Sequence, residues 1–167
     1  RNLQDFRQNI KVTPQEWPPN DPHGTVHSGF ASKLKTLLKN YKEIREFTDE
    51  YDDIILTGHS LGGAISTLFA SQLVSEQTKI KSVHTFGAPP VSSQEFKQYY
   101  KTQGLYSTTF RYTTPRDPVT NLIPFYNHLG NKILLPYNDK SRLKHHDMET
   151  YKKLIKKMDM EEWILFP

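Results

Sequence analysis

The stretch IILTGHSLGGAI, residues 54–65, decides the fold class of this chain. Its first residues, Ile54 to Leu56, form a continuous and partly β-branched apolar run, which is typical of a buried strand in a parallel sheet. Small residues then surround Ser60 at positions 58–62, and a helical pattern begins directly after them. This order indicates a strand that turns sharply into a helix at the serine.

A sharp strand-to-helix turn holds its central residue at a strained backbone angle and needs small neighbours, because the helix passes close to the strand. Gly58 and Gly62 are expected to supply that space. The turn would expose the Ser60 hydroxyl at the carboxyl end of the sheet, where open α/β folds place their sites. The Leu61 backbone N–H, at the start of the helix, would then face a developing oxyanion. Gly-x-Ser-x-Gly also occurs by chance in ordinary tight turns, so the flanking strand and helix carry this interpretation.

The rest of the chain alternates between strand and helix patterns. Strands are predicted at 53–57, 80–86, 108–113 and 132–135, helices at 1–9, 28–51, 61–75, 94–101 and 147–158, and an irregular proline-rich segment at 12–24. Parallel neighbours in a sheet need crossover connections, which are usually helices. The pattern therefore predicts an α/β fold, with a mostly parallel central sheet and helices on both faces, in a single domain over residues 1–167.

Composition excludes several classes of function. The 167 residues include no cysteine, so disulfides and thiolate metal sites are excluded, although this does not fix the cellular compartment. The net charge of +4 is modest and the acidic residues are spread among the basic ones, so we expect no nucleic-acid partner. No apolar run approaches the roughly 18 residues of a membrane span.

A serine hydroxyl is a poor nucleophile unless a base takes its proton and an acid orients that base. In this architecture the order along the chain is serine, acid, histidine, with each residue following a later strand. Asp117 follows the strand predicted at 108–113, and Pro118 holds it in an extended conformation. Asp117 is therefore the predicted acid, with Asp139 as the nearby alternative.

Two adjacent histidines, His145 and His146, stand between the last predicted strand and the closing helix. Either could act as the base on the order of residues alone. With Asp147 they are contiguous, and they lack ligand spacings such as His-Glu-x-x-His. We therefore predict no metal site and no cofactor. Among the other histidines, we expect His59 to pack within the turn.

Several motifs agree in order with one known family. These are TVHSGF at 25–30, LTGHSLGGAISTLFA at 56–70, HTFGAPPV at 84–91, FRYTTPRDPVTNLIP at 110–124, YNHLGNKILLP at 126–136 and HDMETY at 146–151. Across nearly its whole length the chain resembles the class 3 lipases, the α/β-hydrolases best known as fungal triacylglycerol lipases. The resemblance implies Ser60 as nucleophile, Asp117 as acid and His146 as base, because the family's histidine precedes a helix with an aromatic residue a few positions later. His145 is then the fallback.

The resemblance also implies an activity: hydrolysis of fatty-acyl esters of glycerolipids through an acyl-enzyme, at a lipid–water interface and without a cofactor. In this family the first oxyanion donor and the early strands precede a segment like RNLQDF, which here is residues 1–6. We therefore expect this chain to be the C-terminal catalytic portion of the fold, lacking its N-terminal strands and partnered by that missing segment. Residues 1–9 would form a lid.

Two other functions fit the same sequence. One is a lipase-like protein that binds lipid with weak or no turnover, and the other is an esterase or phospholipase A acting on different acyl esters. The sequence leaves the location open, although secretion or association with lipid surfaces would suit the family.

Overall fold

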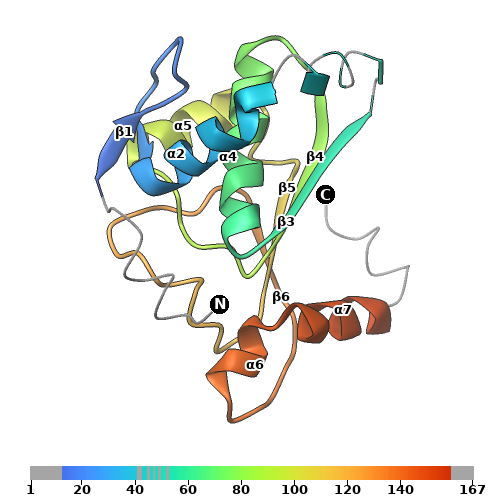
Figure 1. Cartoon of the computed structure of the whole chain (residues 1–167). Helices are drawn as coiled ribbons and strands as arrows, with labels where there is room; N and C mark the ends of the chain where they lie inside the picture. Colours follow the sequence, from blue (N-terminus) through green and yellow to red (C-terminus); the bar gives the residue numbers. More distant parts are fainter. Residues whose placement is uncertain are drawn as a thin grey trace.

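The structure is a computed structural model that describes residues 13–40, 43, 44, 46, 48, 50, 51 and 53–158 (Figure 1). In chain order its elements are β1 (Pro14–Glu16), β2 (Thr25–His27), α2 (Ser28–Leu37), the 3-10 turn η1 (Leu38–Asn40), β3 (Ile54–His59), α4 (Leu61–Ser75), β4 (Ile80–Phe86), α5 (Gln94–Thr102), β5 (Thr109–Thr113), β6 (Asn131–Leu134), α6 (Arg142–His146) and α7 (Met148–Lys157). The helix and lid predicted at residues 1–9 lie outside the described residues.

The central sheet is parallel and has the order β3-β4-β5-β6. Its register places His59 beside Phe86, and Phe86 beside Tyr112. The carboxyl ends of the first three strands are therefore level at one edge of the sheet. A separate antiparallel pair is formed by β1 and β2. The parallel α/β sheet predicted from the sequence is confirmed.

Helices cover both faces of this sheet. On one face, α2, α4 and α5 pack over a large apolar cluster whose buried members include Phe30, Leu34, Leu68, Leu73, Val83, Phe96 and Tyr100. On the other face, α7 packs over a smaller cluster built on Tyr112, Leu135 and Tyr151, against which Phe86 is packed. Strand residues alternate between the two faces. Val83 and Phe86 of the same strand, three positions apart, therefore belong to different clusters.

Two predicted segments differ from the structure. The helix expected over 28–51 ends as an α-helix at Leu37 and tightens into η1, although helical backbone recurs at 43, 44, 46 and 48. An apolar repeat at helical spacing reports which residues face inward, and it does not reveal a break between successive helical segments. The segment 12–24, expected to be irregular, contains β1. Among the described residues β1 pairs with β2 alone, so the missing N–H of Pro14 breaks no hydrogen bond of the ladder there.

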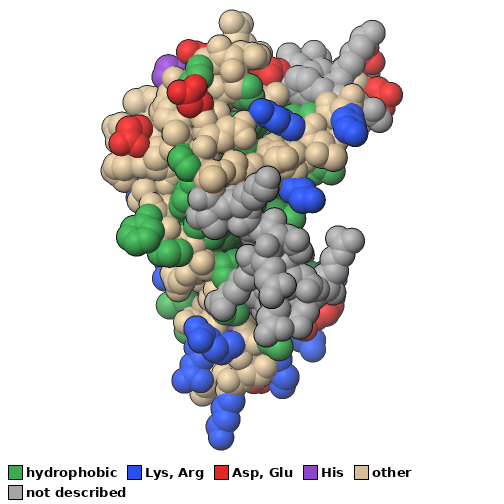
Figure 2. Space-filling view, turned by 60° about the vertical axis from the view of Figure 1, so that its left-hand side comes forward, with side chains coloured by type: hydrophobic (Ala, Val, Ile, Leu, Met, Phe, Trp, Pro, Cys, Tyr) green, Lys and Arg blue, Asp and Glu red, His purple; other side chains and the backbone are tan. Residues whose placement is uncertain are grey.

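The helix α7 carries its charge on the side opposite its apolar stripe. Tyr151 is buried, whereas Lys152, Lys153, Lys156 and Lys157 are exposed. Figure 2 shows Lys and Arg side chains gathered at the lower end of the molecule, the end where Figure 1 places α6 and α7. Within the described parts of the chain, no helix is long and apolar enough to cross a bilayer.

His128 couples the stability of this fold to pH. Its Nε2 donates to the Thr120 carbonyl oxygen at 2.7 Å, and burial, together with the nearby Arg111 guanidinium, lowers its pKa from 6.5 to about 4. The folded state therefore keeps His128 neutral while the unfolded state takes up a proton below pH 6.5. The neutral His128 therefore stabilises the folded state fully above pH 6.5. As the pH falls from 6.5 to about 4, this stabilisation is lost at roughly 1.4 kcal/mol of unfolding free energy per pH unit.

We expect His128→Gln, which keeps an N–H donor but does not titrate, to flatten this pH dependence. Urea titrations between pH 4.5 and 6 would show the free energy of unfolding rising with pH less steeply than in the unmodified protein, by an amount that corresponds to nearly one proton. An unchanged slope would mean that His128 is not held neutral in the folded state.

Candidate active site

Ser60 lies in the sharp turn that joins β3 to α4. Its backbone has φ 55° and ψ −124°, a strained region for a residue with a side chain. A Cβ at Gly58 would overlap the backbone of Gly62, and one at Gly63 would lie 2.8 Å from the Ala88 Cβ. Among the described residues nothing lies within 4 Å of a Cβ built on Gly62. Space is therefore required at Gly58, as expected, and at Gly63, where the small residues were expected to extend it into the helix, whereas the expectation that Gly62 supplies this space was wrong, because a Cβ fits there.

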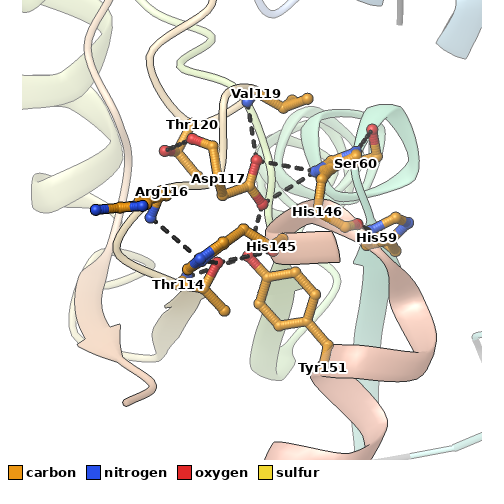
Figure 3. A network of polar contacts seen from close by, with 10 residues as sticks. All are labelled: His59, Ser60, Thr114, Arg116, Asp117, Val119, Thr120, His145, His146 and Tyr151. Carbon is orange, nitrogen blue, oxygen red and sulfur yellow. Dashed lines mark hydrogen bonds and ion pairs between the residues drawn. The ribbon is translucent and has the colours of Figure 1, made fainter. Parts of the chain in front are cut away.

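The structure brings together the three side chains predicted to react (Figure 3). His146 Nε2 lies 2.9 Å from Ser60 Oγ, and His146 Nδ1 lies 3.0 Å from each carboxylate oxygen of Asp117. Ser60 follows β3, Asp117 lies in the loop after β5, and His146 is the last residue of α6. The Asp117 side chain is fully buried and the His146 side chain is 14% exposed. The imidazole therefore bridges a hydroxyl and a carboxylate that is shielded from water.

The Asp117 carboxylate has two further donors besides His146. The Val119 N–H donates to Oδ1 at 2.8 Å, and the Tyr151 hydroxyl donates to Oδ2 at 2.7 Å. Burial and the nearby Asp117 raise the pKa of Tyr151, so the phenol stays protonated and remains a donor. A buried charge is costly unless it is hydrogen-bonded, and these donors offset that cost.

Sequence reasoning missed Tyr151 and Gly87 as parts of this site. Gly87 directly follows β4 with φ 57°, and a Cβ there would overlap Asp117 Oδ2 and lie 3.0 Å from His146 Nδ1. The signals were present: a glycine at the end of a predicted strand, and an aromatic residue five positions after His146. Neither signal indicates contact with an aspartate elsewhere in the chain.

The two alternative residues, His145 for the base and Asp139 for the acid, make other contacts. The His145 ring is buried, with Nδ1 3.1 Å from Thr114 Oγ1 and Nε2 donating to the Asp139 carbonyl oxygen at 3.0 Å. The Asp139 carboxylate accepts from the Ser141 N–H and pairs with Lys144 at 3.1 Å. Of the two adjacent histidines, it is His146 that contacts Ser60 and Asp117.

The amino terminus of α4 lies directly behind Ser60. Leu61 is the first residue of this 15-residue helix, and the first N–H groups of a helix have no acceptor within it. The Gly63 N–H already donates to the Ser60 carbonyl oxygen at 3.0 Å. The Leu61 N–H and the positive end of the helix dipole are thus available to a negative charge beside Ser60. Over the described residues, no group of three or more His, Asp or Glu could hold a metal ion.

The profile that defines the family Lipase (class 3) matches residues 1–127. This chain belongs to the class 3 lipase family. The resemblance recognised in the sequence motifs is therefore confirmed, and the parallel sheet is the matching part of an α/β-hydrolase fold. Ser60 and Asp117 lie within the matched residues, whereas His146 lies beyond them. The position of the histidine therefore depends on the geometry of the site.

Curated relatives in this family are lipases. The chain is 31% identical over 98 residues to secreted mono- and diacylglycerol lipase A of Penicillium cyclopium, which covers 56% of the chain and 31% of that protein. It is 38% identical over 92 residues to lipase A of Sodiomyces alcalophilus, covering 49% of the chain and 22% of the relative. The matched part of this chain thus spans about a third or less of these relatives.

Solved lipase structures have the same fold. A lipase from Rhizopus microsporus var. chinensis superposes with a TM-score of 0.67 at 26% identity, covering 77% of this chain and 47% of that one. A triacylglycerol lipase whose catalytic centre is formed by a serine protease triad superposes with a TM-score of 0.68 at 25% identity, covering 80% and 53%. The chain corresponds to about half of each structure.

Tyr151→Phe tests the hydrogen bond to the buried carboxylate. Removing the hydroxyl leaves Asp117 Oδ2 with one donor fewer, and hydrogen bonds to charged groups contribute about 1.5–3 kcal/mol. We expect the free energy of unfolding, measured with urea at pH 7, to fall by that amount. The matched control is Tyr137→Phe, since no hydrogen bond of the Tyr137 hydroxyl is present among the described residues. Equal losses in the two variants would contradict the assignment.

Proposed function

We propose that this protein is a serine ester hydrolase that cleaves fatty-acyl esters of glycerolipids. The observation that carries the proposal is the chain of contacts from Ser60 Oγ to His146 Nε2, at 2.9 Å, and from His146 Nδ1 to the Asp117 carboxylate, at 3.0 Å. Membership of the class 3 lipases supports it. So does the solved triacylglycerol lipase whose catalytic centre is a serine protease triad.

In the first half of the proposed reaction, Ser60 Oγ attacks the ester carbonyl carbon while His146 Nε2 takes the hydroxyl proton. The carbonyl electron pair moves onto its oxygen, and Asp117 stabilises the imidazolium through Nδ1–H. When the tetrahedral intermediate collapses, the bond to the leaving alcohol breaks and His146 returns the proton to that oxygen. The fatty acyl group then remains bound to Ser60.

The second half repeats these steps with water. Water attacks the acyl carbon, His146 accepts its proton, and the bond to Ser60 Oγ breaks as the proton returns to the serine. In both halves the Leu61 N–H stabilises the oxyanion, supported by the dipole of α4. We place the second donor in the segment that precedes this chain in other members of the family.

The substrate class is drawn from the relatives. The Penicillium cyclopium relative is named a secreted mono- and diacylglycerol lipase, and a relative from Nicotiana tabacum is named a triacylglycerol lipase. These names favour acylglycerol substrates, and the first also favours a secreted protein. Phospholipids and small soluble esters are the competing substrates.

Ser60→Ala should abolish hydrolysis of p-nitrophenyl esters by the full-length protein, because no other described group contacts His146 Nε2 as a nucleophile. Loss of a triad nucleophile lowers kcat by roughly 10⁶-fold, which reduces turnover to the background rate. We expect the unmodified protein to prefer long acyl chains over acetate. Equal activity of the two proteins would refute the triad, and turnover confined to short esters would favour an esterase.

Single alanine substitutions at His145 and His146 distinguish the two candidate bases. We expect His146→Ala to lose at least about 10³-fold in kcat, because the proton acceptor is removed. His145→Ala should keep kcat within about tenfold. The His145 ring contacts Thr114 and Asp139 and takes no part in proton transfer from the Ser60 hydroxyl. Thermal unfolding of both variants separates lost catalysis from lost folding. The opposite order of activities would assign the base to His145.

A further inference from the structure

His59 links the backbone of the proposed base to the strand that carries the proposed nucleophile. It is the last residue of β3 and directly precedes Ser60. Its Nε2 lies 2.7 Å from the backbone carbonyl oxygen of His146, 87 residues further along the chain (Figure 3). A carbonyl oxygen can only accept, so His59 Nε2 carries a proton and donates it.

The accepting carbonyl has a special position, because His146 is the final residue of α6, a helix of only five residues. The last carbonyls of a helix have no partner within it. After His146 the backbone leaves the helical conformation, with φ −68° and ψ 131° at Asp147. The His59 hydrogen bond therefore satisfies a helix-end carbonyl and ties the short helix to β3.

This contact differs in kind from the contact that Asp117 makes. Asp117 meets His146 through Nδ1 and so orients the ring, whereas His59 holds the main chain to which the ring is attached. Because Ser60 is the next residue after His59, the same hydrogen bond fixes where the base backbone lies relative to Ser60 Oγ. The 2.9 Å separation of Ser60 Oγ and His146 Nε2 depends on both restraints.

The surroundings of His59 favour its neutral imidazole. Burial is the largest effect and lowers its pKa; the hydrogen bond to the His146 carbonyl opposes this in part, the charge of His146 lowers the pKa further, and the carboxylates of Asp117 and Asp147 raise it slightly. Among the described residues the Tyr151 ring is another neighbour, with its centroid 5.9 Å away. The His59 and His146 ring centroids are 4.7 Å apart, so a cation on His59 would oppose the imidazolium that forms during catalysis.

We propose that His59 is a positioning residue, whose Nε2–H holds the His146 main chain at the distance from Ser60 that proton transfer requires. This inference rests on the proposed ester hydrolysis. A displacement of about 1 Å between reacting groups costs on the order of 10²-fold in rate, so loss of the restraint has a measurable effect on kcat. Substrate binding does not involve this contact, so KM stays nearly constant.

The test compares two amides at position 59 in the full-length protein. In His59→Gln the side-chain amide nitrogen can reach the position of Nε2 and donate to the carbonyl. In His59→Asn it is one bond too short. Both replacements are polar and neither titrates, so they differ chiefly in whether the hydrogen bond can form. His84→Gln is the control for replacing a half-buried strand histidine, since His84 contacts Ser82 and Tyr112 and does not contact His146.

Two measurements separate positioning from folding. The first is kcat and KM on p-nitrophenyl butyrate. The second is the rate constant and stoichiometry of Ser60 phosphonylation by ethyl p-nitrophenyl hexylphosphonate, in which Ser60 Oγ bonds to phosphorus and p-nitrophenolate leaves. A purely structural defect lowers the number of p-nitrophenolates released per chain. A positioning defect lowers the rate constant while the stoichiometry stays at one.

We expect His59→Asn to lower kcat and the phosphonylation rate constant by about 10- to 100-fold, with KM within about threefold and full stoichiometry. His59→Gln should recover most of both rates. His84→Gln should react like the unmodified protein.

Three results would overturn the inference: an unchanged rate in His59→Asn, equal impairment of His59→Asn and His59→Gln, or lower stoichiometry at an unchanged rate constant. Failure of the proposed function looks different. In that case the unmodified protein and Ser60→Ala would release p-nitrophenol at the same rate from both reagents, whatever stands at position 59.

Discussion

The site depends on the parallel register of β3, β4 and β5. Ser60 directly follows β3 and Gly87 directly follows β4. The Ser60 N–H donates to the Phe86 carbonyl oxygen at 2.9 Å, and the Gly87 N–H donates to the Tyr112 carbonyl oxygen at 3.0 Å, so the sheet ladder continues into the turns. The serine, the glycine beneath the carboxylate and the loop that carries Asp117 therefore leave the sheet at one level. A change of register in any of these strands would separate them.

The buried Asp117 carboxylate joins the site to the core. Its donors come from its own loop through Val119, from α6 through His146 and from α7 through Tyr151. Tyr151 also belongs to the apolar cluster beneath α7. One residue of α7, Tyr151, thus both packs on the sheet and donates to the carboxylate. A loss of packing there would also expose the charge of Asp117.

Much of the fold could be predicted from local patterns. The strand at 80–86 and the helix at 61–75 have the predicted bounds, and the remaining strands and the helices at 94–101 and 147–158 differ by one or two residues at their ends. The errors have physical causes. The apolar repeat from residue 28 onward continues past the end of α2, and β1 is three residues long, too short for an alternating pattern.

The predicted site residues differ in how they could be recognised. Ser60 and Asp117 have local signals, a glycine-flanked turn and an aspartate held before a proline after a strand. His146 was favoured over His145 by family resemblance, and its contacts agree with that choice, although the catalytic roles remain predictions. Tyr151, Gly87 and His59 contact the site through neighbours that are 34, 30 and 87 residues away along the chain. No local pattern in the sequence encodes such pairings.

The sequence by itself determined the alternation of strands and helices, the strained turn at Ser60 and the order of serine, acid and histidine. These features follow from side-chain size, hydrophobic period and backbone preference, which act between residues close along the chain. Local patterns left open which of two adjacent histidines faces the hydroxyl and which donors surround the carboxylate, and the tertiary structure decided both. Those outcomes depend on how α6 and α7 pack on the sheet, because packing sets the distances between residues that are remote in sequence.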